Sequence, residues 1–101
     1  MLRDKLYQYN QLFYFLENKM YEAKVIIGLK EGISDPEGKN TLKALHLLGF
    51  ENVEKAKTYR TIDLIINEKE KDVVRESVEQ MCKRLLTNPV IHDYEIEINE
   101  K

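Results

Sequence analysis

The chain has 101 residues, a formal net charge of −2 and a hydrophobic fraction of 43%. These values predict one globular domain that needs no metal or disulfide for stability, and they argue against disorder and against a nucleic-acid binder, which is usually basic. The single cysteine, Cys82, forms no internal disulfide, which favours a reducing cytoplasm. The longest apolar run near the N-terminus, residues 12–16, is too short for a signal peptide or a membrane span.

Residues 1–19 form a segment of their own, and residues 20–101 follow it as the domain proper. Apolar side chains recur in the segment at alternating intervals of four and three residues, which is the spacing of a helix with a heptad seam. The seam consists of Leu2, Leu6, Tyr9, Phe13, Leu16 and Met20. We expect an amphipathic helical extension. Three interpretations are open: it docks on its own domain, it meets a partner chain, or the natural start is Met20.

The domain begins with a stretch in which every second side chain, from Tyr21 to Leu29, is apolar. The intervening positions are mostly charged, with Ile26 and Gly28 as exceptions. This alternation predicts a strand over residues 21–30 with one buried face. Residues 31–34 then form the turn into the first helix.

The next stretch predicts a helix with a defined start and a defined stop. Asp35 can cap it through its carboxylate, and Pro36 suits the first helical position because its missing N–H needs no partner there. Ser34 with Glu37 three residues later offers a competing capping box, so the start stays open between the two. Gly49 can adopt the left-handed conformation that ends a helix.

This predicted helix has an apolar face and a basic face. The apolar stripe, which we expect to pack on the core, consists of Leu42, Leu45 and Leu48. The basic face consists of Lys39, Lys43 and His46. A solvated face is the preferred interpretation of these cations, ahead of a site for phosphate or for an acidic partner.

The chain after the first helix predicts a hairpin. Residues 53–60 and residues 61–67 are two extended segments, and the second alternates more clearly between apolar and polar side chains. The turn between them is expected around residues 57–60. No strong turn dipeptide separates the two segments, so their register stays open.

A second helix is predicted over residues 72–86. Its apolar stripe consists of Val74, Val78, Met81 and Leu85. Asn88 and Pro89 end this helix and set the direction of the chain into a last strand. Tyr94 begins the alternation of that strand, and we expect it to anchor the strand in the core.

The order strand, helix, strand, strand, helix, strand predicts the fold class. Short loops and right-handed crossovers turn it into an α+β, ferredoxin-like βαββαβ sandwich, in which two helices cover one face of a four-stranded antiparallel sheet. The other face would carry Ile26, Ile65 and Tyr59 among charges. Because large apolar side chains on an open face favour a covering partner, we expect a homodimer or a higher oligomer.

The chain carries few side chains suited to catalysis. Cys82, His46 and His92 lack the spacing of a metal site, and no serine or glycine pattern indicates a nucleophile or a nucleotide loop. Asp35 could serve as a catalytic carboxylate, but a helix cap followed by proline already explains it. We therefore expect no catalytic, cofactor-binding or metal residue, and an assembly or binding role.

Two stretches of the domain carry the motifs of a known family. The first runs Asp35-Pro36-Glu37-Gly38 and ends in Leu48-Gly49-Phe50, and the second runs from Met81 through Asn88-Pro89 to Tyr94. In this order and at this separation they resemble PurS, the small subunit of phosphoribosylformylglycinamidine (FGAM) synthase in purine biosynthesis. The resemblance covers about four-fifths of the chain, from Met20 onward.

The chain departs from the family pattern in two places. The family usually has a glycine-lysine pair in the hairpin, where this chain has Tyr59 and Arg60. Arg60 keeps the charge, but Tyr59 lacks the backbone freedom of glycine, which puts the hairpin geometry in doubt. The helix expected in residues 1–19 has no counterpart in the family.

The resemblance implies a ferredoxin-like dimer without catalytic residues of its own. It would bridge a glutaminase subunit, PurQ, and a synthetase subunit, PurL, and support ammonia transfer between them. The complex would use ATP, Mg and glutamine to convert formylglycinamide ribonucleotide to formylglycinamidine ribonucleotide. The matched positions that become candidates for structure and partner contacts are Asp35, Pro36, Gly38, Arg60, Asn88, Pro89 and Tyr94.

Two other functions are compatible with the predicted fold. One is a small-molecule-sensing domain that binds an effector between subunits, although the glycine-rich loop expected at such a site is missing. The other is an RNA-binding module that reads single strands with sheet aromatics. The charge argues against RNA, and the sheet offers at most Tyr59 among acidic residues.

Overall fold

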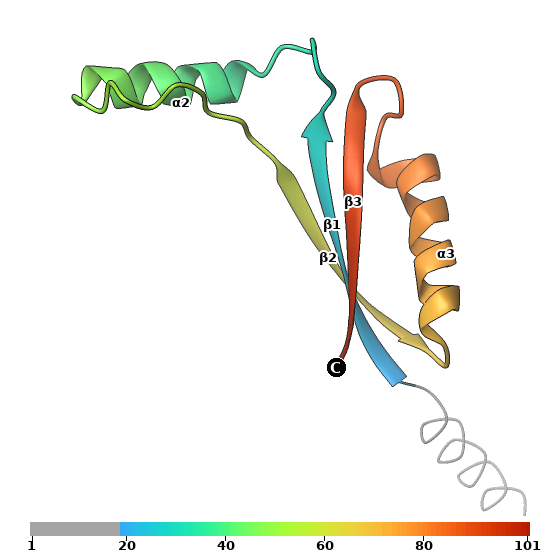
Figure 1. Cartoon of the computed structure of the whole chain (residues 1–101). Coiled ribbons are helices and arrows are strands. Elements are labelled where there is room, and N and C mark those ends of the chain that lie inside the picture. Colours follow the sequence, from blue (N-terminus) through green and yellow to red (C-terminus); the bar gives the residue numbers. More distant parts are fainter. Residues whose placement is uncertain (1–18) are drawn as a thin grey trace, which may run out of the picture.

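The computed structural model describes residues 19–101, which form an α+β domain (Figure 1). The elements in chain order are β1 (Lys19–Leu29), α2 (Pro36–Leu47), β2 (Arg60–Glu68), α3 (Lys71–Met81), the π-helical turn η1 (Cys82–Leu86) and β3 (His92–Glu100). The helix predicted for residues 1–19 lies outside the described residues, apart from Lys19, where β1 begins.

The sheet is antiparallel, with strand order β2-β1-β3. In its register, Ala23 of the central strand faces Leu64 of β2 and Ile98 of β3. The alternation predicted for β1 is confirmed, because Ala23 and Val25 have no exposed surface while their neighbours on the other face are half-buried. The core therefore lies between the central strand and α3.

The predicted four-stranded sheet is wrong for the described chain. β2 begins at Arg60, and residues 53–59 belong to no strand, so residues 19–101 form a three-stranded sheet. The tight turns that reverse a hairpin need positive φ angles, and the only described residues with positive φ are Gly32 and Gly49. No described residue near position 60 has this conformation, which agrees with the path of the chain, since it does not reverse there. Residues 53–59 instead run beside α2 (Figure 1).

The prediction that both helices cover one face of the sheet is also wrong. α3 packs against the sheet, whereas α2 projects away from it (Figure 1). Gly38 is the only buried residue of α2, and Leu48, expected in the core stripe, is 74% exposed. Capping and apolar spacing determine where a helix begins and ends, but they do not determine the surface on which it docks.

The apolar stripe of the second helix is shifted at its C-terminal end. Val74 and Val78 are buried as predicted, but Cys82 is buried in place of Met81, and Leu85 is 82% exposed. The π-helical turn η1 widens the helix here, so that Leu86 packs against the core. The hydroxyl of Thr87 donates a hydrogen bond of 2.9 Å to the Cys82 carbonyl oxygen and closes this turn.

Candidate functional site

The most unusual feature of the fold is the arm, which we define as residues 34–59. The chain leaves the sheet after β1, forms α2, reverses at Gly49 and comes back along the helix as the return segment, residues 53–59 (Figure 1). Gly49 has a φ of 97°, and the Phe50 N–H donates a 2.9 Å hydrogen bond to the Leu45 carbonyl oxygen. The predicted helix stop is therefore present, and it directs the chain back toward the sheet.

Asp35 holds both ends of the arm together. Its Oδ1 accepts hydrogen bonds from the Gly38 N–H at 2.9 Å and from the Thr58 hydroxyl at 2.8 Å, and its Oδ2 accepts one from the Thr58 N–H at 2.8 Å. The bond from Gly38, followed by those from Thr58, lowers the pKa of the Asp35 carboxyl. Asp35, rather than Ser34, is thus the cap, and it also holds the return segment against the helix start.

Gly38 and Pro36 shape the first turn of α2 around this contact. A Cβ on Gly38 would overlap the Ala56 carbonyl oxygen and lie 2.7 Å from Asp35 Oδ2. Glycine therefore lets the return segment cross directly over the helix. Pro36 occupies the first helical position, as predicted. The Asp-Pro-x-Gly motif is explained by this crossing as well as by the cap.

The far end of the arm is tied by His46. Its Nε2 lies 2.7 Å from the Val53 carbonyl oxygen, which joins the last turn of α2 to the return segment. The sequence pattern predicted a solvated His46, and it predicted that Asp35 bonds only to its own helix. Neither Thr58 nor Val53 carries a sequence signal for these contacts, since both depend on where the chain reverses.

Tyr59 and Arg60 lie where the arm rejoins the sheet. The Tyr59 ring covers Gly28, where a Cβ would lie 2.6 Å from Tyr59 Cε1. No described residue other than glycine has a positive φ, so Tyr59 needs none of the backbone freedom that the family's glycine would supply. Arg60 is exposed at the first position of β2, opposite Ile27.

Asn88, Pro89 and Tyr94 form a second group, between the end of α3 and β3. Asn88 Oδ1 accepts a 3.0 Å hydrogen bond from the Val90 N–H, and the Asn88 N–H donates to His92 Nδ1 at 2.9 Å. The exposed Pro89 lies within this turn. The structure therefore does not bring the seven candidate residues into one site: four belong to the arm or its junction with β2, and three to this turn and strand.

Tyr94 ties β3 to α3. Its hydroxyl donates a 2.7 Å hydrogen bond to Glu79 Oε2, which is the main cause that raises the pKa of Tyr94 to about 12. The ring packs against the core, so the expected anchoring position is confirmed. The carboxylate partner on the helix was not foreseen, because the spacing of the two residues in sequence gives no indication of it.

The described residues offer little reactive chemistry. Between Lys19 and Lys101, no group of three or more His, Cys, Asp and Glu side chains could hold a metal ion. The Cys82 thiol is fully buried, and burial, then the charge of Glu79, raises its pKa, which disfavours the nucleophilic thiolate. None of the helices in this part of the chain is both long and apolar enough to span a membrane.

Large apolar side chains are exposed in several places. At the tip of the arm, Leu47 is 80% exposed and Leu48 and Phe50 are exposed with it. On the sheet face opposite α3, Ile65 is 52% exposed, and Tyr59, at the other end of β2, is exposed as well, as expected for an open face. A cluster of exposed apolar side chains such as the one at the arm tip is typical of a surface that contacts another chain.

The fold and its surfaces define a class of protein: a small α+β assembly module that works by contacting other chains. The comparison with known families identifies which one. The model of the family described as PurS, phosphoribosylformylglycinamidine (FGAM) synthase, matches residues 22–100. The chain belongs to the PurS family.

Individual relatives agree with the family match. The chain is 52% identical over 81 residues to the PurS subunit of Methanocaldococcus jannaschii, a match that covers 80% of this chain and 98% of the relative. It is 36% identical to the Bacillus subtilis PurS subunit, over 80% of this chain and 95% of that one. Both relatives are phosphoribosylformylglycinamidine synthase subunits.

Solved structures show the same fold. The crystal structure of M. jannaschii PurS, a subunit of formylglycinamide ribonucleotide amidotransferase in the purine biosynthetic pathway, superposes with a TM-score of 0.75 over 80% of this chain and 98% of that chain. A PurLQS structure from Thermotoga maritima, 24% identical, contains the same fold at a TM-score of 0.70, over 81% of this chain and 98% of that chain.

Proposed function

We propose that the chain is the non-catalytic small subunit of FGAM synthase in purine biosynthesis, bridging the PurQ glutaminase and the PurL synthetase and supporting ammonia transfer between them. The observation that carries this role is the combination of exposed apolar surfaces on the arm and sheet with a buried thiol and structurally engaged Asp35 and Tyr94. Such a surface suits binding to larger subunits. The names of the relatives and the T. maritima PurLQS assembly support it.

We further propose that the larger subunits hold the ATP, Mg and glutamine, and that the complex works in the cytoplasm. The relatives are named as subunits of the synthase, which agrees with such a division of labour. In the small subunit, Asp35, Pro36 and Gly38 would hold the arm in place for its contacts. Asn88, Pro89 and Tyr94 would hold the turn into β3, and the exposed Arg60 would contact a neighbouring chain.

The subunit is proposed to act as a homodimer. The support is α2, a helix of 12 residues with a single buried residue, because a helix this short is marginal in water unless it packs on something. In the same proposal, the four-stranded ferredoxin-like sandwich is completed only when two copies associate.

The heptad seam in residues 1–19 supports an added helix there, and light scattering with and without residues 1–18 tests whether it strengthens the dimer.

Reconstitution with purified PurL and PurQ tests the bridging role. With ATP, Mg and glutamine, synthesis of formylglycinamidine ribonucleotide should rise strongly when this chain is added. With ammonium replacing glutamine as the nitrogen source, the chain should matter much less, because no ammonia has to pass between subunits. Glutamine-dependent synthesis that is equally fast without the chain would contradict the proposal.

One observation favours a second function, the sensing of a small molecule. A hollow of about 550 Å³ lies at the root of the arm, between residues 29–35 and residues 54–59, and four lysines line it together with the carboxylates of Glu31, Asp35 and Glu54. The lysines are Lys30, Lys39, Lys55 and Lys57. A thermal-shift screen with nucleotides and amino acids tests this function, since a ligand that binds the folded state raises its melting temperature.

A further inference from the structure

The hollow at the root of the arm is built by three segments of the chain. Its walls come from residues 29–35, which lead out of β1, from residues 54–59 of the return segment, and from the side of α2 that carries Lys39. Its volume of about 550 Å³ lies within the range of pockets that hold small molecules. The hydrogen bonds from Thr58 to Asp35 join two of these segments, so the hollow has a fixed frame.

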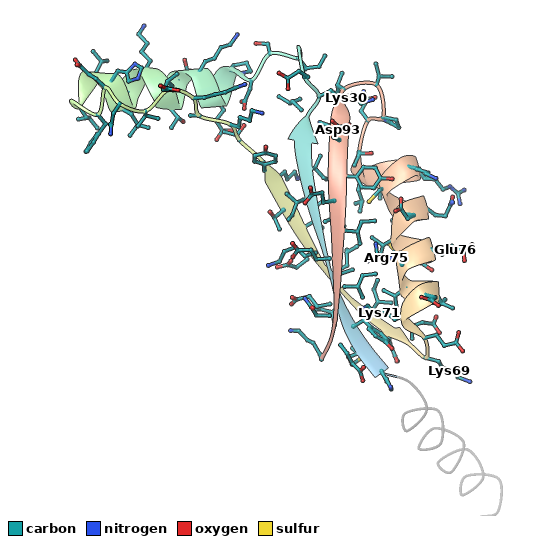
Figure 2. The ribbon with its side chains drawn as sticks, viewed as in Figure 1. Lys30, Lys69, Lys71, Arg75, Glu76 and Asp93 are labelled. Atoms are coloured by element: carbon teal, nitrogen blue, oxygen red, sulfur yellow. The ribbon has the colours of Figure 1, made fainter. Side chains whose placement is uncertain are left out.

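Lysines come to this hollow from each segment that builds it. Lys30 lies where the chain leaves the sheet toward the arm (Figure 2). Lys39 belongs to the first turn of α2, and Lys55 and Lys57 belong to the return segment. Within residues 19–101 none of the four forms an ion pair, and only Lys39 has a side-chain hydrogen bond, 3.3 Å from its Nζ to Ser34 Oγ. Four lysines with unused donors therefore line one hollow.

The carboxylates of the lining have two different roles. Asp35 already accepts three hydrogen bonds within the arm, so it belongs to the frame of the hollow. Glu31 and Glu54 have no hydrogen bond or ion pair in the part of the chain that the structure describes. A ligand that uses the whole lining therefore carries negative charge for the lysines and hydroxyl or amino donors for the two glutamates.

Tyr59 adds an aromatic surface to the same hollow. Its ring covers Gly28, yet the residue keeps 60% of its surface exposed. An exposed aromatic ring beside cations is a platform on which a nucleobase stacks, because every base has a π-face. Lysines bind phosphate as point charges, and carboxylates accept hydrogen bonds from ribose hydroxyls. The three kinds of lining therefore correspond to the three parts of a nucleotide.

We infer that the hollow binds a ribonucleoside phosphate, with the phosphate at the lysines, the ribose hydroxyls at the free glutamates and the base on the Tyr59 ring. This inference rests on the small-molecule-sensing function proposed above and names the class of ligand. Other polar ligands use only part of the lining. Inorganic phosphate leaves the glutamates and the ring without a partner, and an amino acid brings a single carboxylate to four lysines.

A nucleotide in this position would contact both walls of the arm's root. Residues 29–35 lead from the sheet into α2, and the return segment leads back from α2 to β2. A ligand held between them would fix the direction in which the arm leaves the sheet. Amide hydrogen exchange at Thr58, on the wall of the hollow, should therefore become slower when the nucleotide is bound.

Calorimetric titration of the full-length chain with AMP, ribose 5-phosphate and adenosine tests the inference. AMP should bind tightest, because it alone has a phosphate, a ribose and a base. Ribose 5-phosphate lacks the base and adenosine lacks the phosphate, so each should bind weaker than AMP by about tenfold or more. Added sodium chloride should weaken the binding of AMP, since salt screens the attraction between phosphate and lysines.

Two pairs of lysine variants show whether AMP binds in the hollow. Lys55→Ala with Lys57→Ala removes two exposed cations of the lining and should weaken AMP binding by about tenfold or more. The matched control, Lys43→Ala with Lys83→Ala, removes the same charge from exposed positions outside the lining and should change the affinity by less than about twofold. Tyr59→Ala should weaken the binding of AMP but leave that of ribose 5-phosphate unchanged.

The other outcomes separate the ligand class from the sensing function. Adenosine that binds as tightly as AMP, or an amino acid that binds where AMP does not, would overturn the nucleotide and leave small-molecule sensing intact. Equal affinities of the two lysine pairs for AMP would place the nucleotide outside the hollow and contradict the inference as well. A screen in which no nucleotide or amino acid binds would overturn the sensing function together with the inference. The role in FGAM synthase is tested independently, by the reconstitution with PurL and PurQ.

Discussion

The two helices of this protein have equally clear sequence patterns and opposite environments. α3 places Val74 and Val78 against the sheet with no exposed surface. α2 has the better cap, a proline at its start and a glycine at its stop, yet buries only Gly38. The comparison shows that capping and apolar spacing determine where a helix forms, whereas a packing surface determines where the helix docks in the tertiary structure. For α2, such a surface has to come from outside the sheet of its own chain.

The largest expected effect comes from the arm tip. The pair Leu47→Asp and Leu48→Asp should convert the dimer into a monomer, because burying each leucine contributes about 1.5–3 kcal/mol and a buried carboxylate has no partner there. The dissociation constant should rise by at least about two orders of magnitude, measured by sedimentation equilibrium. Lys43→Ala, an exposed change on the basic face of α2, is the control. Unchanged affinity of the double variant would remove the arm tip from the interface.

Within the docked helix, Val78→Ala tests the core. The change removes buried methyl groups and leaves a cavity, so the free energy of unfolding should fall by about 2–3 kcal/mol in chemical denaturation. Leu85→Ala is the matched control on the same helical unit, and its exposed side chain predicts a change within about 0.5 kcal/mol. Equal losses for both variants would show that the π-helical turn does not separate buried from exposed positions as described.

Gly38→Ala should invert the usual effect of that substitution in a helix. Alanine normally stabilises a helix interior by about 1 kcal/mol relative to glycine. Here the added Cβ overlaps the Ala56 carbonyl oxygen, so the arm should lose about 1–3 kcal/mol, seen as faster amide exchange in the return segment. Asn40→Ala, at an exposed position of the same helix, should leave this exchange unchanged. Slower exchange in Gly38→Ala would rule out the close crossing.

Asp35 gives the arm a pH dependence. Its pKa is lowered in the folded state, so its contribution is present above the ordinary value of 3.8 and is lost as the pH falls through the folded pKa. Protection of the Gly38 and Thr58 amides, measured by NMR hydrogen exchange, should therefore decline below about pH 4. Asp35→Asn should reduce this protection at neutral pH and flatten the decline, whereas Asp63→Asn should do neither. A decline that survives Asp35→Asn would assign it to another group.

The smallest effect is expected where α3 is tied to β3. Tyr94→Phe removes the hydrogen bond to Glu79, and the free energy of unfolding should fall by about 1 kcal/mol at neutral pH. The raised pKa of Tyr94, about 12, means that this contribution is present below pH 10 and is lost as the pH rises toward 12. Tyr59→Phe, a change at an exposed ring, is the control. An ultraviolet titration that lacks a tyrosine ionising near pH 12 would contradict the bond.

Much of the local structure could be predicted from the chain alone. The β1 alternation, the cap at Asp35, the stop at Gly49 and the buried pair Val74 and Val78 depend on neighbours within a few residues, and all are present. The motifs that indicated the PurS family are of the same local kind. These features can be predicted from sequence because capping, glycine conformation and apolar spacing depend on residues within one or two helical turns of each other.

The tertiary structure decided the remaining features, since each depends on contacts between residues distant in sequence. Asp35 binds Thr58 across the arm, and this contact holds the return segment against α2. Tyr94 finds Glu79 only because β3 lies beside α3. The sequence by itself determined β1, the start and the stop of α2 and the buried pair of α3, but not the fate of residues 53–59, which form no strand. Long-range contacts decided whether α2 lies on its own sheet or projects away from it. Apolar spacing defines which face of a helix is suited to burial, but it does not specify the surface, or the chain, that buries this face.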